Sequence, residues 1–127
     1  MSTSITVLMS AFLISAAPQK EETLTKEDGT YIVNTTTLGK DVMGYEGSTP
    51  LKIYIKKNKV VKIEALKNHE TPKYFAKIKK ELLNKWDGMK VNDALKQEVD
   101  GVTGATFSSD AVKKNVQLGL EYYKKHK

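Results

Sequence analysis

A two-residue turn between two alternating segments directs this chain toward an antiparallel sheet. Apolar and polar side chains alternate along residues 51–56 and again along residues 59–66. In the second segment, Val61, Ile63 and Ala65 form the face that we expect to be buried. Alternation of this kind is typical of strands with one buried and one solvated face. The intervening Lys57-Asn58 has the length of a tight hairpin turn, so the two strands are predicted to pair directly.

Helices are predicted on the C-terminal side of this hairpin. Apolar residues recur at helical spacing over residues 72–86 and 110–123, and a short helix is expected at 92–96. The residues that define the two long apolar faces are Phe75, Ile78, Leu82, Trp86, Val112, Val116, Leu120 and Tyr123. With a further strand at 30–36, this order predicts a single α+β domain, in which helices pack on a small, mostly antiparallel sheet.

The loop at residues 100–109, Asp-Gly-Val-Thr-Gly-Ala-Thr-Phe-Ser-Ser, is the main candidate for a binding site. Gly104 and Ala105 allow the backbone to approach a bulky anion, and Ser108 or Ser109 is expected to cap the following helix. Free amides and the positive end of the helix dipole would favour a phosphate there. The same residues also fit a helix cap that binds nothing, and the pattern alone leaves both interpretations open.

Two common nucleotide-binding motifs are excluded at this loop. A P-loop ends in Gly-Lys-Ser/Thr, and no such lysine follows here. A Rossmann fingerprint needs a third glycine within a strand-helix-strand unit, and this is also missing. The loop is therefore not of the ATP-binding or NAD-binding type.

The loop resembles the attachment motif of the FMN-binding domain family, which occurs in flavin-carrying subunits of bacterial Na⁺-pumping and Rnf-type oxidoreductases. The matching positions are Asp100, Thr103, Gly104, Ala105, Thr106 and Ser108. The resemblance implies that FMN is joined through its phosphate to the hydroxyl of Thr106 by a separate flavin transferase that uses FAD. It also implies that Asp100 holds the loop or, together with Gly104, Ala105 and Thr106, is read by the transferase.

Two further segments agree with this resemblance, which spans about residues 29–123. Gly-Tyr-x-Gly at 44–47 and Glu-Thr-Pro at 70–72 precede the loop in the order found in the family. By this analogy, Tyr45, Glu70, Thr71 and Pro72 lie near the flavin ring. The complete set of expected cofactor-binding residues is Thr103, Gly104, Ala105, Thr106, Phe107, Ser108, Ser109, Tyr45, Glu70, Thr71 and Pro72.

The N-terminal residues differ in composition from the rest of the chain. Residues 1–17 carry no charge and end in Ser-Ala-Ala, which indicates a secretory signal peptide or a short membrane anchor. Residues 18–28 are expected to be a charged linker, and residues 29–127 the FMN-binding domain. An extracytoplasmic location follows from this interpretation, either periplasmic or at the cell surface.

The charge and the histidine content limit the other functional classes. The net charge is +6, yet the chain has no arginine, the usual reader of phosphates and bases, so we expect no nucleic-acid binding. Two histidines, His69 and His126, and no cysteine are too few for a conventional metal site, so none is expected.

The sequence therefore predicts an exported electron carrier or redox subunit rather than an enzyme that acts alone. The expected partners are the flavin transferase and redox proteins, including a membrane reductase, with membrane association possible. A reductase with non-covalent FMN and a secreted binding module without flavin are the alternatives.

Overall fold

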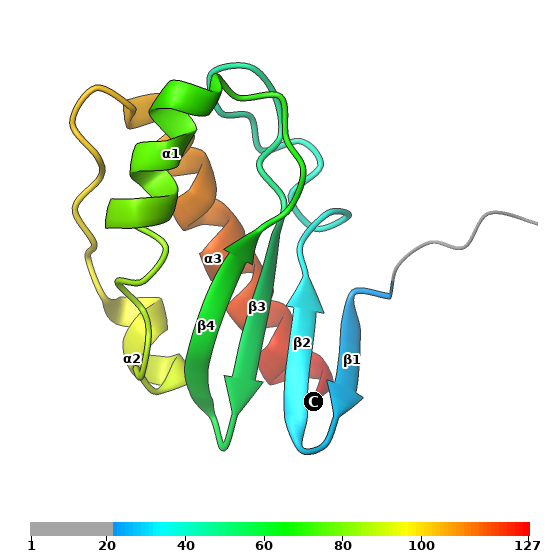
Figure 1. Ribbon diagram of the computed structural model, residues 1–127. Helices are drawn as coiled ribbons and strands as arrows, with labels where there is room; N and C mark the ends of the chain where they lie inside the picture. The colour runs from blue at the N-terminus through cyan, green and yellow to red at the C-terminus, as the bar shows by residue number, and fades with distance from the viewer. Residues whose placement is uncertain (1–21) are drawn as a thin grey trace, which may run out of the picture.

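The computed structural model describes residues 22–127, which form a four-stranded antiparallel sheet and three helices (Figure 1). The strands lie in the order β1-β2-β3-β4. Their bounds are Leu24–Glu27, Thr30–Asn34, Leu51–Lys56 and Lys59–Ala65, and the helices α1, α2 and α3 are Pro72–Glu81, Val91–Lys96 and Thr106–His126. The predicted α+β class is confirmed.

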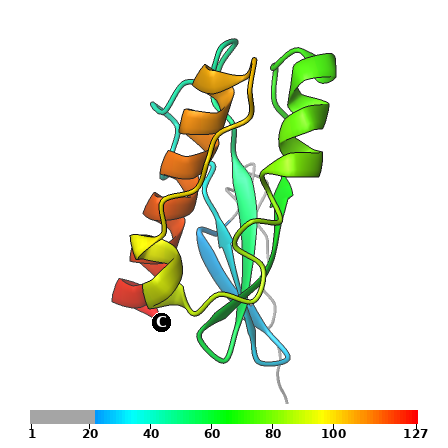
Figure 2. The same cartoon turned by 90° about the vertical axis from the view of Figure 1, so that its left-hand side faces the viewer.

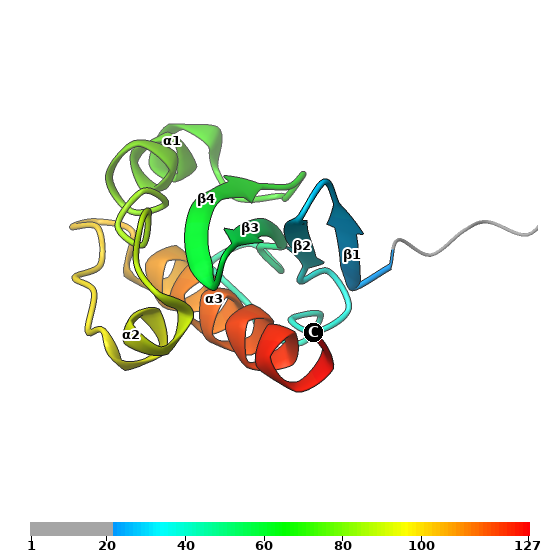
Figure 3. The ribbon, with the colours of Figure 1, turned by 90° about the horizontal axis from the view of Figure 1, so that it is seen from below.

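The long helix α3 lies across one face of the sheet, while α1 lies beside β4 (Figure 3). At Gly119, an added Cβ atom would lie 2.6 Å from Cδ1 of Ile53, so the absence of a side chain permits the close packing of α3 on β3. All eight residues of the two predicted apolar helix faces are buried in the core, including Trp86. Trp86 is therefore a core residue.

The predicted hairpin is confirmed, but one of its buried positions was wrong. Lys57 and Asn58 both have positive φ angles, 53° and 62°, as a tight hairpin turn requires. In β4, Val60 is buried and Val61 is 48% exposed, because the register shifts between Tyr54 and Ile55. Val61 is the extra residue of a β-bulge, which turns it away from the core.

Several element ends differ from the sequence prediction. The strand β1 lies within the segment 18–28 that was expected to be a linker, so the sheet begins before residue 29. The strand β2 stops at Asn34, whose side chain accepts the Thr36 N–H at 2.9 Å in a local turn. Helix α1 ends at Glu81, and the chain continues to Trp86 in tight turns that still bury Leu82.

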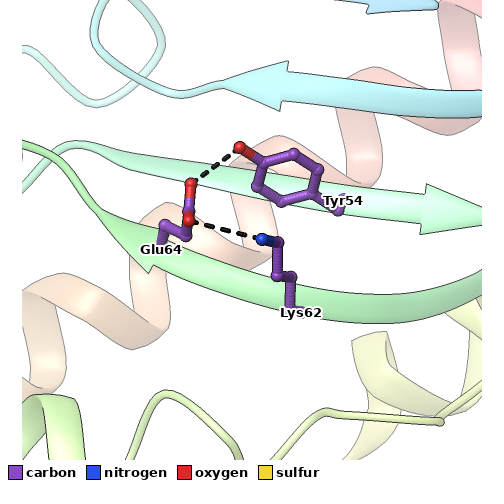
Figure 4. Close-up of polar contacts among 3 residues, drawn as sticks. All are labelled: Tyr54, Lys62 and Glu64. Atoms are coloured by element: carbon purple, nitrogen blue, oxygen red, sulfur yellow. Dashed lines mark hydrogen bonds and ion pairs between the residues drawn. The ribbon is translucent and has the colours of Figure 1, made fainter. Parts of the chain in front are cut away.

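The opposite face of the sheet carries a small polar network on β3 and β4 (Figure 4). The Tyr54 hydroxyl donates to Oε1 of Glu64 at 2.7 Å, and Nζ of Lys62 lies 3.4 Å from Oε2. The hydrogen bond to Glu64 raises the pKa of Tyr54 to about 12, and the same bond lowers the pKa of Glu64. At neutral pH Tyr54 therefore keeps its hydroxyl proton and Glu64 stays ionised, which are the states that this hydrogen bond requires.

The predicted signal peptide or anchor at residues 1–17 lies outside the described residues. Among the helices of residues 22–127, none combines the length and the apolar character that a membrane span requires.

Candidate functional site

The loop before α3 is held by its two apolar residues. Val102 and Ala105 are buried, and the Ala105 N–H donates to the Val102 carbonyl at 3.0 Å. The Val102 N–H in turn donates to Oγ of Ser109 at 3.0 Å. Between these anchors Gly104 has a φ of 85°, the conformation for which glycine was expected here. The loop is therefore fixed at both ends.

Helix α3 begins at Thr106, two residues before the predicted cap. Its N-cap residue is Ala105, which has no side chain to bond the helix amides, so the predicted capping by Ser108 or Ser109 is wrong. The two serines lie inside the first turns because the buried Ala105 already starts the helix. The Ser109 N–H donates to the Ala105 carbonyl at 2.9 Å, and the three preceding amides have no helical carbonyl to bond.

Thr106 lies at the start of this first turn with its side chain exposed. Its hydroxyl makes no hydrogen bond with any residue in the described part of the chain. A threonine in this place is open to a second protein and stands beside the free amides of the helix. Thr103 and Asp100 are exposed in the same loop.

Glu70 connects the three segments around the site. Its side chain is only 5% exposed, and its Oε1 and Oε2 accept the N–H groups of Tyr45 at 2.9 Å and Glu46 at 2.5 Å. The Ser108 hydroxyl also donates to Oε1. A Cβ atom on Gly44 would clash with this oxygen, so the loop at 44–47 reaches the carboxylate only because residue 44 is glycine. Glu70 therefore fixes this loop against the start of α3.

A second helix begins at the same end of the molecule. Helix α1 begins at Pro72, as the sequence predicted, and Thr71 is its N-cap. In Figure 2, the beginnings of α1 and α3 lie at the same end, at the top of the view. Neither helix has an acidic residue in its first turn, so both dipoles contribute positive potential to this end.

Three exposed aromatic side chains surround this place. Tyr45 is 71% exposed, Phe107 66% and Tyr74 49%. The rings of Tyr45 and Phe107 are stacked, with their centroids 6.4 Å apart and their planes inclined by 30°. Exposed aromatic rings are uncommon on a small domain, and together they offer flat apolar surface to a planar ligand.

These groups line one pocket of about 390 Å³, which is within the size range of small-molecule sites. Its lining residues are Tyr45, Glu70, Thr71, Tyr74, Gly104, Ala105, Thr106, Phe107 and Ser108. Of the predicted cofactor-binding residues, Thr103, Ser109 and Pro72 do not line it. Ser109 is fully buried and bonds the loop backbone instead.

Tyr74 is the lining residue that the sequence analysis missed. It lies three positions after Thr71 and therefore on the same side of the first turn of α1. Its neighbour Phe75 belongs to the core, so Tyr74 was the one ring of this pair directed away from the core. The three-residue spacing between Thr71 and Tyr74 was therefore the signal in the sequence that could have identified Tyr74 as a lining residue.

The site is suited to a planar aromatic ligand that carries an anionic group. The helix amides at Thr106 and the absence of first-turn acids suit a phosphate, while the three rings suit a flat heterocycle. Fold and site thus define a small α+β domain that binds such a ligand.

The comparison with protein families identifies this class. The model of the FMN-binding domain matches residues 44–121, which is more than half of the chain. The chain belongs to the FMN-binding domain family, and FMN is its cofactor. Neither the curated proteins nor the solved structures that were searched gave a match. The resemblance drawn from the loop motif is confirmed.

Proposed function

We propose that this protein is an exported electron-transfer flavoprotein that carries FMN as a phosphoester on Thr106. The observation that carries the proposal is the exposed, unbonded Thr106 hydroxyl at the rim of the aromatic pocket. FMN would supply one-electron and two-electron chemistry when bound, and the protein would hold it and adjust its potential.

The surroundings of Thr106 support attachment by a separate enzyme. A threonine hydroxyl is a weak nucleophile at neutral pH and needs a neighbouring base. The nearest carboxylate of the pocket, Glu70, already accepts three hydrogen bonds, and no histidine lines the pocket. A flavin transferase would therefore supply the base.

The transfer would balance with FAD as the donor. Oγ of Thr106 would form a bond to the phosphorus of the FMN half and lose its proton to the transferase. The pyrophosphate bond of FAD would break, and AMP would leave. No oxidant or reductant is needed in this step.

The remaining residues would hold the attached group. The first amides of α3 would bond the phosphate oxygens, and Tyr45, Tyr74 and Phe107 would contact the ring. Glu70 and Ser108 would keep the Tyr45 loop and the α3 start in register. An open pocket of this kind leaves the cofactor accessible to redox partners.

The location and partners form part of the proposal. Residues 1–17 would direct export, and the domain would then lie outside the cytoplasm. Its partners would be the transferase and redox proteins, including a membrane reductase, rather than a small substrate that the domain converts by itself.

Intact-mass analysis of protein purified from its native host, with flavin fluorescence read in a denaturing gel, tests the attachment. We expect the wild type to carry one FMN on the peptide that contains Thr106. The Thr106→Ala variant should lose the fluorescent band, and Thr106→Ser should keep it because the hydroxyl remains.

Three results would decide among the alternatives. Fluorescence that persists in Thr106→Ala would place the attachment elsewhere. A wild type that binds FMN only before denaturation would indicate a non-covalent flavoprotein, and a wild type without flavin in cells that contain the transferase would overturn the assignment.

A further inference from the structure

A second pocket, at the end of the molecule opposite the flavin site, is formed largely by lysines. It has a volume of about 620 Å³ and lies between the β3–β4 turn, α2 and the C-terminal residues. The six lysines that line it, here called the lysine end, are Lys57, Lys59, Lys90, Lys96, Lys124 and Lys127. The lining contains one acidic side chain, that of Asp93.

The backbone holds two lysines of the lysine end, Lys59 and Lys90, side by side, and a third lysine, Lys56, lies next to them. Lys59 pairs with Lys56 across the hairpin, and an isolated bridge also pairs Lys59 with Lys90. The Val91 N–H donates to the Asn58 carbonyl at 2.8 Å, which fixes α2 next to the turn. Directly opposed like charges destabilise a sheet. The fold thus retains a repulsion that a bound anion would relieve.

Two lysines outside the lysine end form ion pairs with carboxylates in the described residues 22–127. Lys62 pairs with Glu64 on the open face of the sheet (Figure 4), and Lys113 pairs with Asp110 on α3. These are the two ion pairs of the described residues, and neither involves the lysine end. Its positive charge is therefore largely uncompensated by the protein itself.

We propose that the lysine end docks on the headgroup layer of an anionic phospholipid membrane. Clusters of four to eight basic residues bind such surfaces by adding a small contribution from each charge. Lysine ammonium groups on flexible stems suit a layer of mobile phosphates, which demands no fixed geometry.

The composition of the lysine end disfavours a protein partner. The centres of protein interfaces are enriched in aromatic residues and arginine and depleted in lysine. The aromatic residue of this lining, Tyr123, is buried, and its hydroxyl bonds Asn58. The absence of arginine likewise disfavours specific contact with nucleic-acid bases.

The position of the lysine end sets the orientation of the docked domain. Helix α3 starts at the flavin site with Thr106 and reaches the lysine end with its last turn, as Figure 1 shows. Its 21 residues span roughly 30 Å. A domain docked by the lysine end would turn its flavin pocket away from the lipid, where redox partners have access.

Co-sedimentation with lipid vesicles tests the proposal on the full chain. The probe is a vesicle of phosphatidylcholine mixed with phosphatidylglycerol, compared with phosphatidylcholine alone. We expect binding to the anionic vesicles only, and loss of binding at about 1 M salt, where charges are screened within ~3 Å.

Two triple variants with the same charge change locate the surface. Lys57→Gln, Lys59→Gln and Lys124→Gln together should weaken vesicle binding by roughly 100-fold, since each lysine adds about a factor of five near an anionic surface. The matched control, with Lys77→Gln, Lys80→Gln and Lys85→Gln, alters exposed lysines of α1 and the turn after it. It should retain binding within about threefold.

Four results would overturn the proposal. One is the absence of binding to anionic vesicles, and another is an equal loss in both triple variants, which would indicate net charge alone. A third is equal binding to phosphatidylcholine vesicles. The fourth is tighter binding of the lysine end to duplex DNA or an acidic peptide than to vesicles, which would assign this surface to another class of partner. None of these results depends on flavin attachment.

Discussion

Glu70 shows how one buried carboxylate can organise a binding site without taking part in chemistry. Its charge is stabilised by two backbone N–H groups and one hydroxyl, from Tyr45, Glu46 and Ser108. Hydrogen bonds to a charged acceptor are stronger than neutral ones, and breaking them leaves buried donors unsatisfied. The shape of the aromatic pocket therefore depends on a buried carboxylate in its own lining.

Replacement of Glu70 by glutamine should loosen this arrangement. The new side-chain amide would direct its NH₂ group at one of the donors, so we expect the free energy of unfolding to fall by about 1–3 kcal/mol. Urea denaturation measures this change. The neighbouring Glu46→Gln, on an exposed side chain, should stay within about 0.5 kcal/mol of wild type. Equal effects of the two substitutions would contradict the assigned role.

The Tyr54–Glu64 bond gives a prediction about pH. The raised pKa of Tyr54, about 12, means that its contribution to stability is full below its ordinary pKa of 10 and is lost as the pH rises toward 12. In Glu64→Ala the hydrogen-bond acceptor is absent, which removes the largest cause of the rise, so Tyr54 should ionise closer to pH 10. Tyrosinate absorbance, compared between proteins with Tyr54 and their Tyr54→Phe variants, reports the value. An unchanged titration in Glu64→Ala would refute the stated cause.

At the scale of the elements, the packing of α3 on the sheet connects the core with both functional ends. The helix carries Thr106 at its start and approaches β3 closely at Gly119. A shift of the helix at Gly119 would therefore move the threonine relative to the loops that Glu70 holds.

Gly119→Ala tests this packing. The added methyl would lie 2.6 Å from Ile53 and 3.1 Å from Cγ2 of Thr35, both in the interior. Overpacking costs about 1–3 kcal/mol, and the better helix propensity of alanine returns about 1 kcal/mol. We expect a net loss of about 1 kcal/mol in thermal or urea unfolding. Gln117→Ala, on the exposed side of the same helix, should be neutral or slightly stabilising; a loss as large as that of Gly119→Ala would argue against the packing explanation.

The periodic elements were predictable from sequence, and the irregular ones were not. The apolar faces of α1 and α3 and the 57–58 turn depend on local spacing, which the sequence displays. The strand β1 has one apolar residue, Leu24, among polar neighbours, and it forms by backbone pairing with β2. The bulge at Val61 depends on how two strands meet, which alternation in one strand does not reveal.

The sequence predicted most of the residues that form the candidate site, but not the hydrogen bonds that they make. The loop motif located Thr106, and the three segments around Tyr45, Glu70 and the loop do meet at one pocket. Ser108 and Ser109 were expected to cap the helix and to bind the cofactor, yet their hydroxyls bond Glu70 and the Val102 N–H. Their partners are distant in sequence or created by the loop fold, and a motif carries no information about either.

For the whole molecule, the two ends are predicted to act independently. The flavin pocket and the lysine end share no lining residue and lie at opposite ends of α3. Substitutions far apart are generally additive. We therefore expect Thr106→Ala to bind anionic vesicles like wild type, and the triple variant of the lysine end to acquire FMN to the wild-type level. Mass analysis measures the FMN content and co-sedimentation measures the vesicle binding of the same preparations. A loss of vesicle binding in Thr106→Ala, or of FMN in the triple variant, would show that the two ends are coupled.

The early start of the sheet has a geometric consequence for the segment that precedes it. The Thr23 carbonyl already accepts the Asn34 N–H at 2.8 Å, so the chain is attached to the sheet from that residue onward. Only residues 18–22 separate this point from the uncharged stretch 1–17, and five residues extend at most ~18 Å. If residues 1–17 stayed in a lipid bilayer, this short segment would keep the β1 edge of the sheet within ~18 Å of the bilayer. Redox partners would then have to approach the flavin pocket from the sides of the domain that do not face the lipid.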